Sequence, residues 1–79
     1  MDVPKLKNIY IIFNNNVYCR GQKISADCKH FKELKYGYGV DNQNLYWDGH
    51  KLNILTNYEI LKNGFMKYND ILYYNGIIV

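Results

Sequence analysis

The stretch Leu45-Tyr46-Trp47-Asp48-Gly49-His50-Lys51-Leu52 occurs three times with small changes, and it identifies the architecture. The other copies are Val17-Tyr18-Cys19-Arg20-Gly21-Gln22-Lys23-Ile24 and Leu72-Tyr73-Tyr74-Asn75-Gly76-Ile77-Ile78-Val79. Each copy has an aliphatic residue, a tyrosine, a variable residue, a turn position, a glycine and a closing aliphatic residue. The copies are 28 and 27 residues apart, and self-similarity at such a period indicates a repeat protein.

Turn-forming residues divide each copy into two strands. Asp48-Gly49 and Asn75-Gly76 favour positive φ at both centres of a type I′ turn, which joins antiparallel strands. Arg20 takes this slot in the first copy, which leaves the type of the first turn open. Upstream, Ile9-Tyr10-Ile11-Ile12-Phe13 is β-branched and aromatic and predicts a further strand. Polar turns rich in Asn and Asp precede the three hairpins, at residues 14–16, 41–44 and 68–70.

The segments between the hairpins also repeat. Phe31-Lys32-Glu33-Leu34-Lys35 matches Tyr58-Glu59-Ile60-Leu61-Lys62 at an offset of 27 residues. An aromatic residue and a leucine three positions apart share one side of a helical turn, and Asp27 is placed to cap it. We therefore predict short helical connectors.

The fold expected from these patterns is mainly β. We predict a single β-repeat domain over residues 1–79, with a polar lead-in at residues 1–8. It contains three repeats of about 27 residues, each an antiparallel β-meander or hairpin with a short helical connector. The repeats span approximately residues 9–35, 36–62 and 63–79. Tyrosines alternate with aliphatic residues along the strands, so both faces are apolar and the repeats should stack.

Composition places the chain among small cytosolic proteins. The 79 residues carry a formal net charge of +3, with Lys and Arg spread along the chain rather than gathered in the basic stripe of a nucleic-acid site. No signal peptide opens the sequence, and no segment approaches the roughly 20 apolar residues of a membrane span. Disulfide frameworks usually need more than two cysteines, so we expect Cys19 and Cys28 to be reduced.

Catalytic and metal-binding patterns are absent from the sequence. The single serine and single threonine, Ser25 and Thr56, lie in no nucleophile motif. The residues that could be combined into a metal site are His30, His50, Asp27, Asp48 and Cys28. Their spacings match no zinc template. We therefore expect a protein that is not an enzyme and that uses neither a metal nor a cofactor.

Partner contacts are expected where the copies differ, because positions shared by all copies build the scaffold. Tyr and Trp dominate interface hot spots. Trp47, Asp48 and His50 differ between the copies around the central turn, and Tyr36 and Tyr38 approach them in sequence. Together with Tyr46, which we expect to be exposed like Tyr36, they are the predicted partner-binding residues. The alternative is that most of these rings belong to the core. Trp47 and Leu45 lie two residues apart and share one face of a strand, and Leu45 is expected to face inward, so a core position is favoured for Trp47.

A second route to binding is a strand edge. Ile77-Ile78-Val79 is an apolar strand that can recruit a strand from a partner or form a homodimer with a second copy. The alternative is closure against residues 9–13 within one molecule. Both arrangements remain open.

A family resemblance suggests the nature of the partner. The residues that carry it are Ala26, Asp27, Phe31, Leu34, Tyr38, Asp41, Asn44, Tyr46 and Gly49. With them the chain resembles the DKNYY family of bacterial repeat proteins over nearly its whole length. The run Asp41-Asn42-Gln43-Asn44-Leu45-Tyr46-Trp47 departs from the signature, because it lacks the lysine and one tyrosine. Such proteins are often encoded beside secreted polymorphic toxins, including those of contact-dependent growth inhibition. The resemblance therefore implies an immunity protein that binds and neutralises a cognate toxin.

Two other functions fit the sequence. A small nucleic-acid-binding β module would use aromatic rings and scattered lysines to stack bases. A structural repeat protein would have no toxin partner. The net charge of +3 argues against an inhibitor that fills a basic nuclease site through opposite charge. It favours contacts through shape and aromatic rings.

Overall fold

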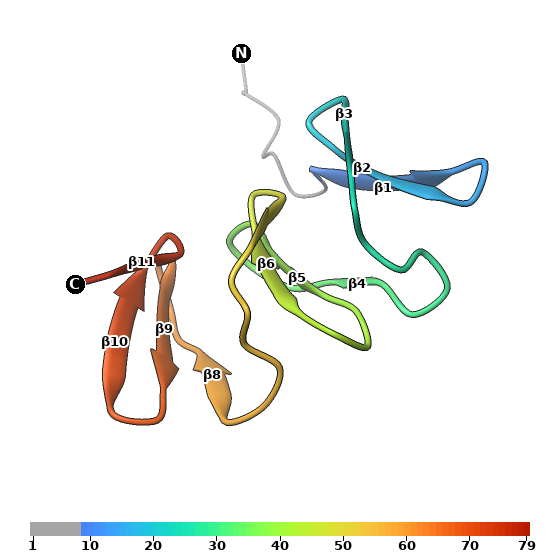
Figure 1. Cartoon of the computed structure of the whole chain (residues 1–79). Coiled ribbons are helices and arrows are strands. Elements are labelled where there is room, and N and C mark those ends of the chain that lie inside the picture. Colours follow the sequence, from blue (N-terminus) through green and yellow to red (C-terminus); the bar gives the residue numbers. More distant parts are fainter. Residues whose placement is uncertain (1–8) are drawn as a thin grey trace, which may run out of the picture.

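Three antiparallel sheets follow one another along the chain in the computed structural model, which describes residues 9–79 (Figure 1). The first sheet contains β1 (Tyr10–Phe13), β2 (Asn16–Cys19) and β3 (Gln22–Ile24). The second contains β4 (Lys32–Glu33), β5 (Tyr38–Val40), β6 (Leu45–Trp47) and β7 (His50–Lys51). The third contains β8 (Tyr58–Ile60), β9 (Phe65–Tyr68), β10 (Ile71–Tyr74) and β11 (Ile77–Ile78). The mainly β prediction is confirmed, and the predicted lead-in of residues 1–8 lies outside the described residues.

The three glycine turns have the same backbone conformation. At the first centre φ is 51° for Arg20, 47° for Asp48 and 48° for Asn75. The glycines that follow have φ of 82°, 83° and 79°. Two consecutive positive φ values are the mark of a type I′ turn, which matches the twist of the strands it joins. The turn type left open at Arg20 is therefore the same as in the other two copies.

Strand register makes the three sheets equivalent residue by residue. The residue before each glycine turn pairs with the equivalent position of the preceding strand: Cys19 with Tyr10, Trp47 with Tyr38, and Tyr74 with Phe65. The turn amides of Arg20, Asp48 and Asn75 donate to the carbonyls of Ile9, Gly37 and Gly64, respectively, at 2.8, 2.8 and 3.0 Å. One structural unit is thus built three times, and Phe65 occupies the place of Tyr10 and Tyr38.

The predicted helical connectors are wrong, because no helix occurs in residues 9–79. The first connector forms β4, whose Lys32 and Glu33 pair with β5, and the second forms β8, which pairs with β9. A helix of one turn leaves most of its backbone groups without partners, whereas pairing with the following strand satisfies them. Asp27 caps no helix, and its Oδ1 instead accepts the amide of Lys29 in a local turn at 3.1 Å.

Each hydrophobic core lies between two consecutive sheets. The first joins buried Tyr10, Val17 and Cys19 to partly buried side chains that include Phe31 of the next connector. The second contains Tyr38, Leu45, Ile54 and Met66, with surrounding side chains from the second and third sheets. The outer side of the third sheet has no such cover among the described residues, and Leu72, Tyr74 and Val79 are 41%, 45% and 73% exposed.

Tyrosine hydroxyls connect each sheet to the next. The hydroxyl of Tyr10 donates to the Gly37 carbonyl and accepts the Gly49 amide, at 2.8 and 3.0 Å. The hydroxyl of Tyr38 donates to the Gly64 carbonyl and accepts the Gly76 amide, at 3.0 and 3.2 Å. Burial raises the pKa of both tyrosines above its ordinary value, so each hydroxyl keeps the proton that it donates. These bridges fix the register between sheets.

The stacked sheets form a flat molecule. Its principal extents are 37 × 37 × 15 Å, and the first and third sheets lie on either side of the second (Figure 1). Residues 9–79 contain no helix with the length and apolar character needed to cross a bilayer.

Candidate functional site

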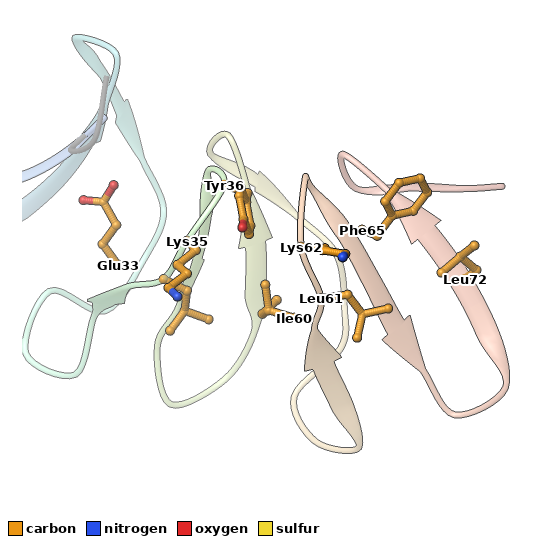
Figure 2. A pocket seen from close by; sticks show the side chains of 9 residues that line it. Glu33, Lys35, Tyr36, Ile60, Leu61, Lys62, Phe65 and Leu72 are labelled. Carbon is orange, nitrogen blue, oxygen red and sulfur yellow. The ribbon is translucent and has the colours of Figure 1, made fainter. Parts of the chain in front are cut away.

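An open groove of about 1130 Å³ lies along the second and third sheets (Figure 2). Its lining is mainly apolar, with charged residues among the apolar ones: Glu33, Leu34, Lys35, Tyr36, Ile60, Leu61, Lys62, Phe65 and Leu72. Concave, largely apolar surfaces with a few polar groups are typical of binding sites. We refer to it as the groove.

Two equivalent segments build the groove. Leu34-Lys35-Tyr36 follows β4, and Leu61-Lys62-Asn63 follows β8. In both, the leucine amide donates across a tight turn to a backbone carbonyl. The Leu34 amide donates to the carbonyl of Tyr38 at 2.7 Å, and the Leu61 amide donates to that of Phe65 at 2.8 Å. Tyr36 and Asn63 then take φ of 60° and 59°, and a glycine follows each. The repeated turns therefore set a Leu-Lys pair at the same place on both sheets.

The charges around the groove are mostly positive. Lys35 and Lys62 are in no ion pair with any residue of the described range. Glu33 is engaged in the fold, because its Oε2 accepts the amide of Ile9 at 3.2 Å and so ties the second sheet to the first. Burial raises the pKa of Glu33. A partner would therefore meet an apolar floor with two available ammonium groups.

Of the six predicted site residues, Tyr36 lines the groove and is 44% exposed. Tyr38 and Tyr46 are 0% and 1% exposed, so they belong to the core and offer no surface to a partner. Trp47 is half-buried against the second core, and its Nε1 donates to the Tyr36 carbonyl at 3.1 Å. The expected exposure of Tyr46 is wrong, because Phe31 lies beside its ring and its hydroxyl donates to the Ser25 carbonyl and the Asp41 carboxylate.

The remaining two predicted residues, Asp48 and His50, lie in a smaller concavity between the first and second sheets. Asp48 is already engaged, because its Oδ1 accepts Nε of Arg20 at 2.7 Å and the thiol of Cys19 at 3.5 Å. Burial, together with the hydrogen bond to Asp48, raises the pKa of the Cys19 thiol to about 11. The structure thus separates these residues from Tyr36 and does not gather the six on one surface.

Asp41 is a buried carboxylate with a structural role. It is 7% exposed, and its Oδ1 accepts the amides of Gln43 and Asn44 at 2.8 Å each. Its Oδ2 accepts the amide of Asp27 and the hydroxyl of Tyr46 at 2.9 Å each. Burial by itself raises the pKa of Asp41. The four hydrogen bonds together outweigh burial and leave the pKa below its ordinary value. Burial, together with the hydrogen bond to Asp41, raises the pKa of Tyr46 to about 12.

The apolar lining of the groove was not predicted. Leu34, Ile60 and Leu61 were assigned to the predicted helical connectors, and Phe65 and Leu72 were assigned to strands. The signal that could have located them is the repeated Leu-Lys pair directly before a residue with left-handed backbone and a glycine. No group of three metal-ligating side chains gathers anywhere in residues 9–79.

No protein-family model, curated protein or solved structure matches this chain.

Proposed function

We propose that the chain is a protein-binding module whose groove contacts a partner protein, and that this partner is a bacterial toxin that it neutralises. The observation that carries the first part is the groove itself, with a half-exposed Tyr36 and Phe65 on an apolar floor. Aromatic side chains in such a position supply contact area at low entropic cost. The resemblance to the DKNYY family supports the second part, and the two cysteines, both free, fit a cytosolic setting.

The charge of the groove indicates how the partner would bind. Lys35 and Lys62 would meet an acidic or polar rim on the toxin, while the leucines and rings would occupy an apolar patch. The contact would block the active or partner-binding surface of the toxin by stoichiometric cover. The direct test mixes this chain with the toxin encoded beside its gene. Equimolar addition should abolish toxin activity, and an unchanged activity at that ratio would remove the proposal.

Replacing Tyr36 tests the groove as the contact surface. Tyr36→Ala should weaken binding to the toxin by about 2 kcal/mol, or roughly 30-fold, because a central aromatic anchor is lost. Alanine inherits the same left-handed backbone, so that strain is unchanged. Phe13→Ala is the matched control, since Phe13 is a 61% exposed ring on β1 outside the groove. Titration calorimetry should show the control binding like wild type, and equal losses for both variants would exclude the groove.

Single-stranded nucleic acid is a second candidate ligand for the same surface. The groove places Tyr36 and Phe65 beside Lys35 and Lys62, the groups that stack bases and contact phosphates. Binding of this kind would weaken steeply with salt. A fluorescence titration with labelled single strands at two salt concentrations decides the matter, because a flat response at low salt eliminates this function.

A further inference from the structure

The contact between consecutive sheets has two different sides. One side is a glycine turn. The other side is the surface of the preceding sheet on which that turn packs, and we call this surface the seat. A Cβ placed on Gly49 would lie 3.1 Å from Cβ of Cys19 and 3.2 Å from Cγ2 of Ile24, both in the first sheet. A Cβ placed on Gly76 would lie 2.9 Å from Cβ of Trp47 in the second sheet. The turns at Gly49 and Gly76 thus pack closely against the preceding sheet.

The third sheet carries the same seat, and no part of residues 9–79 packs on it. Tyr74 stands where Cys19 and Trp47 stand, and Val79 stands where Ile24 stands. These two side chains are 45% and 73% exposed. With their neighbours they surround an apolar cavity of about 380 Å³, lined by Phe65, Tyr74, Ile77, Ile78 and Val79. An apolar surface of this kind on a small protein marks an interaction site.

The first sheet carries the complementary side. Gly21 has the same turn conformation as the other two glycines, with φ of 82°. A Cβ placed on it would meet no atom of the described residues within 4 Å. Ile11, on the neighbouring strand, is 61% exposed. The first and third sheets lie on either side of the second, so one molecule cannot join its own two sides (Figure 1).

We propose that a second copy of this chain docks head to tail, with its Arg20-Gly21 turn in the seat formed by Tyr74 and Val79. The contact would continue the stacking already seen twice within the molecule. It would set Arg20 of one copy beside neutral Asn75 of the other, and no like charges would meet at the turns. Such a heterologous contact extends into rings or filaments rather than closing as a symmetric dimer.

One difference from the internal contacts limits the strength of this association. Phe65 occupies the position of Tyr10 and Tyr38, so the third sheet has no hydroxyl to bridge the next one. In the docked pair, a hydroxyl at position 65 would accept a hydrogen bond from the Gly21 amide of the second copy and donate one to its Ile9 carbonyl. Phe65→Tyr restores it at a partly exposed ring position.

Sedimentation velocity from about 1 µM to 1 mM tests the proposal. Wild type should associate with rising concentration, and Phe65→Tyr should tighten the dissociation constant about tenfold, as expected for a new pair of hydrogen bonds. Gly21→Ala should weaken association through a clash absent from the monomer, and Val79→Asp should weaken it from the other side. Circular dichroism confirms that each variant is folded before it is compared.

Mixing the two weakened variants gives the sharpest result. Each should be monomeric alone, while the mixture should form a dimer that does not extend, because it retains one intact seat and one intact turn. A wild type that stays monomeric throughout the range would overturn the proposal. Self-association of Gly21→Ala at wild-type strength would also overturn it, since a contact between two third sheets does not involve the turn.

Discussion

Replacing Asp41 with alanine should lower the free energy of unfolding by about 3 kcal/mol, because its carboxylate holds several backbone amides that then lose their acceptor. Asp41→Asn should cost less, about 2 kcal/mol. The amide oxygen can still accept from Gln43 and Asn44, but the NH₂ group opposes the amide of Asp27. The Tyr46 hydroxyl keeps an acceptor in this variant, because it also donates to the Ser25 carbonyl at 3.2 Å.

The effect of Asp41 should depend on pH. Its pKa in the folded protein lies below the ordinary value of about 3.9, so the carboxylate contributes its full stabilisation above that value. This contribution is lost as the pH falls through the folded-state pKa. Urea unfolding should therefore show the gap between wild type and Asp41→Asn narrowing below about pH 4. Asp70→Asn, at an exposed turn, is the control and should change stability by under about 0.5 kcal/mol at any pH.

Replacing Gly76 with alanine should also cost about 3 kcal/mol, from two separate sources. The left-handed backbone costs a non-glycine residue about 1 to 2 kcal/mol. The new methyl group would lie 2.9 Å from Cβ of Trp47, an atom close to the backbone that cannot rotate away. Overpacking of this kind costs about 1 to 3 kcal/mol.

Gly21→Ala separates the two sources. It has the same φ but no close neighbour in the described residues, so it should cost only about 1 kcal/mol. Gly49→Ala should fall between the two, because its nearest contacts are slightly longer, at 3.1 and 3.2 Å. The comparison is made by urea unfolding at a concentration where all variants are monomeric. Equal losses at Gly21 and Gly76 would mean that the turns do not pack on the preceding sheets.

The turns were predictable from sequence because their chemistry is local. Asp48-Gly49 and Asn75-Gly76 specify a type I′ turn on their own, and the alternation around them predicts the strands. The connectors were not predictable in this way. The spacing of Phe31 and Leu34 is compatible with a helical turn. The segment between them is a strand only because it pairs with the first strand of the next hairpin. That pairing is a tertiary contact, which local periodicity does not encode.

The candidate site was harder to predict than the fold. Comparing the copies pointed to residues around the central turn, but it could not tell a core ring from a surface ring, and only Tyr36 of the six lines the groove. Tyr46 and Tyr36 were both expected at the surface, yet Tyr46 is buried and Tyr36 is 44% exposed. Exposure at the groove depends on how two sheets lie side by side, and this follows from the tyrosine bridges between them.

Amide hydrogen exchange of the three turn glycines tests the stacking of the sheets most directly. A hairpin by itself gives these amides no acceptor, and in this structure Gly49 and Gly76 donate to tyrosine hydroxyls of the preceding sheet. Gly21 has no acceptor in residues 9–79. Stacking therefore predicts that Gly49 and Gly76 exchange about 100-fold or more slowly than Gly21 in the monomer, which corresponds to an opening free energy near 3 kcal/mol. Equal exchange rates at all three glycines would contradict it.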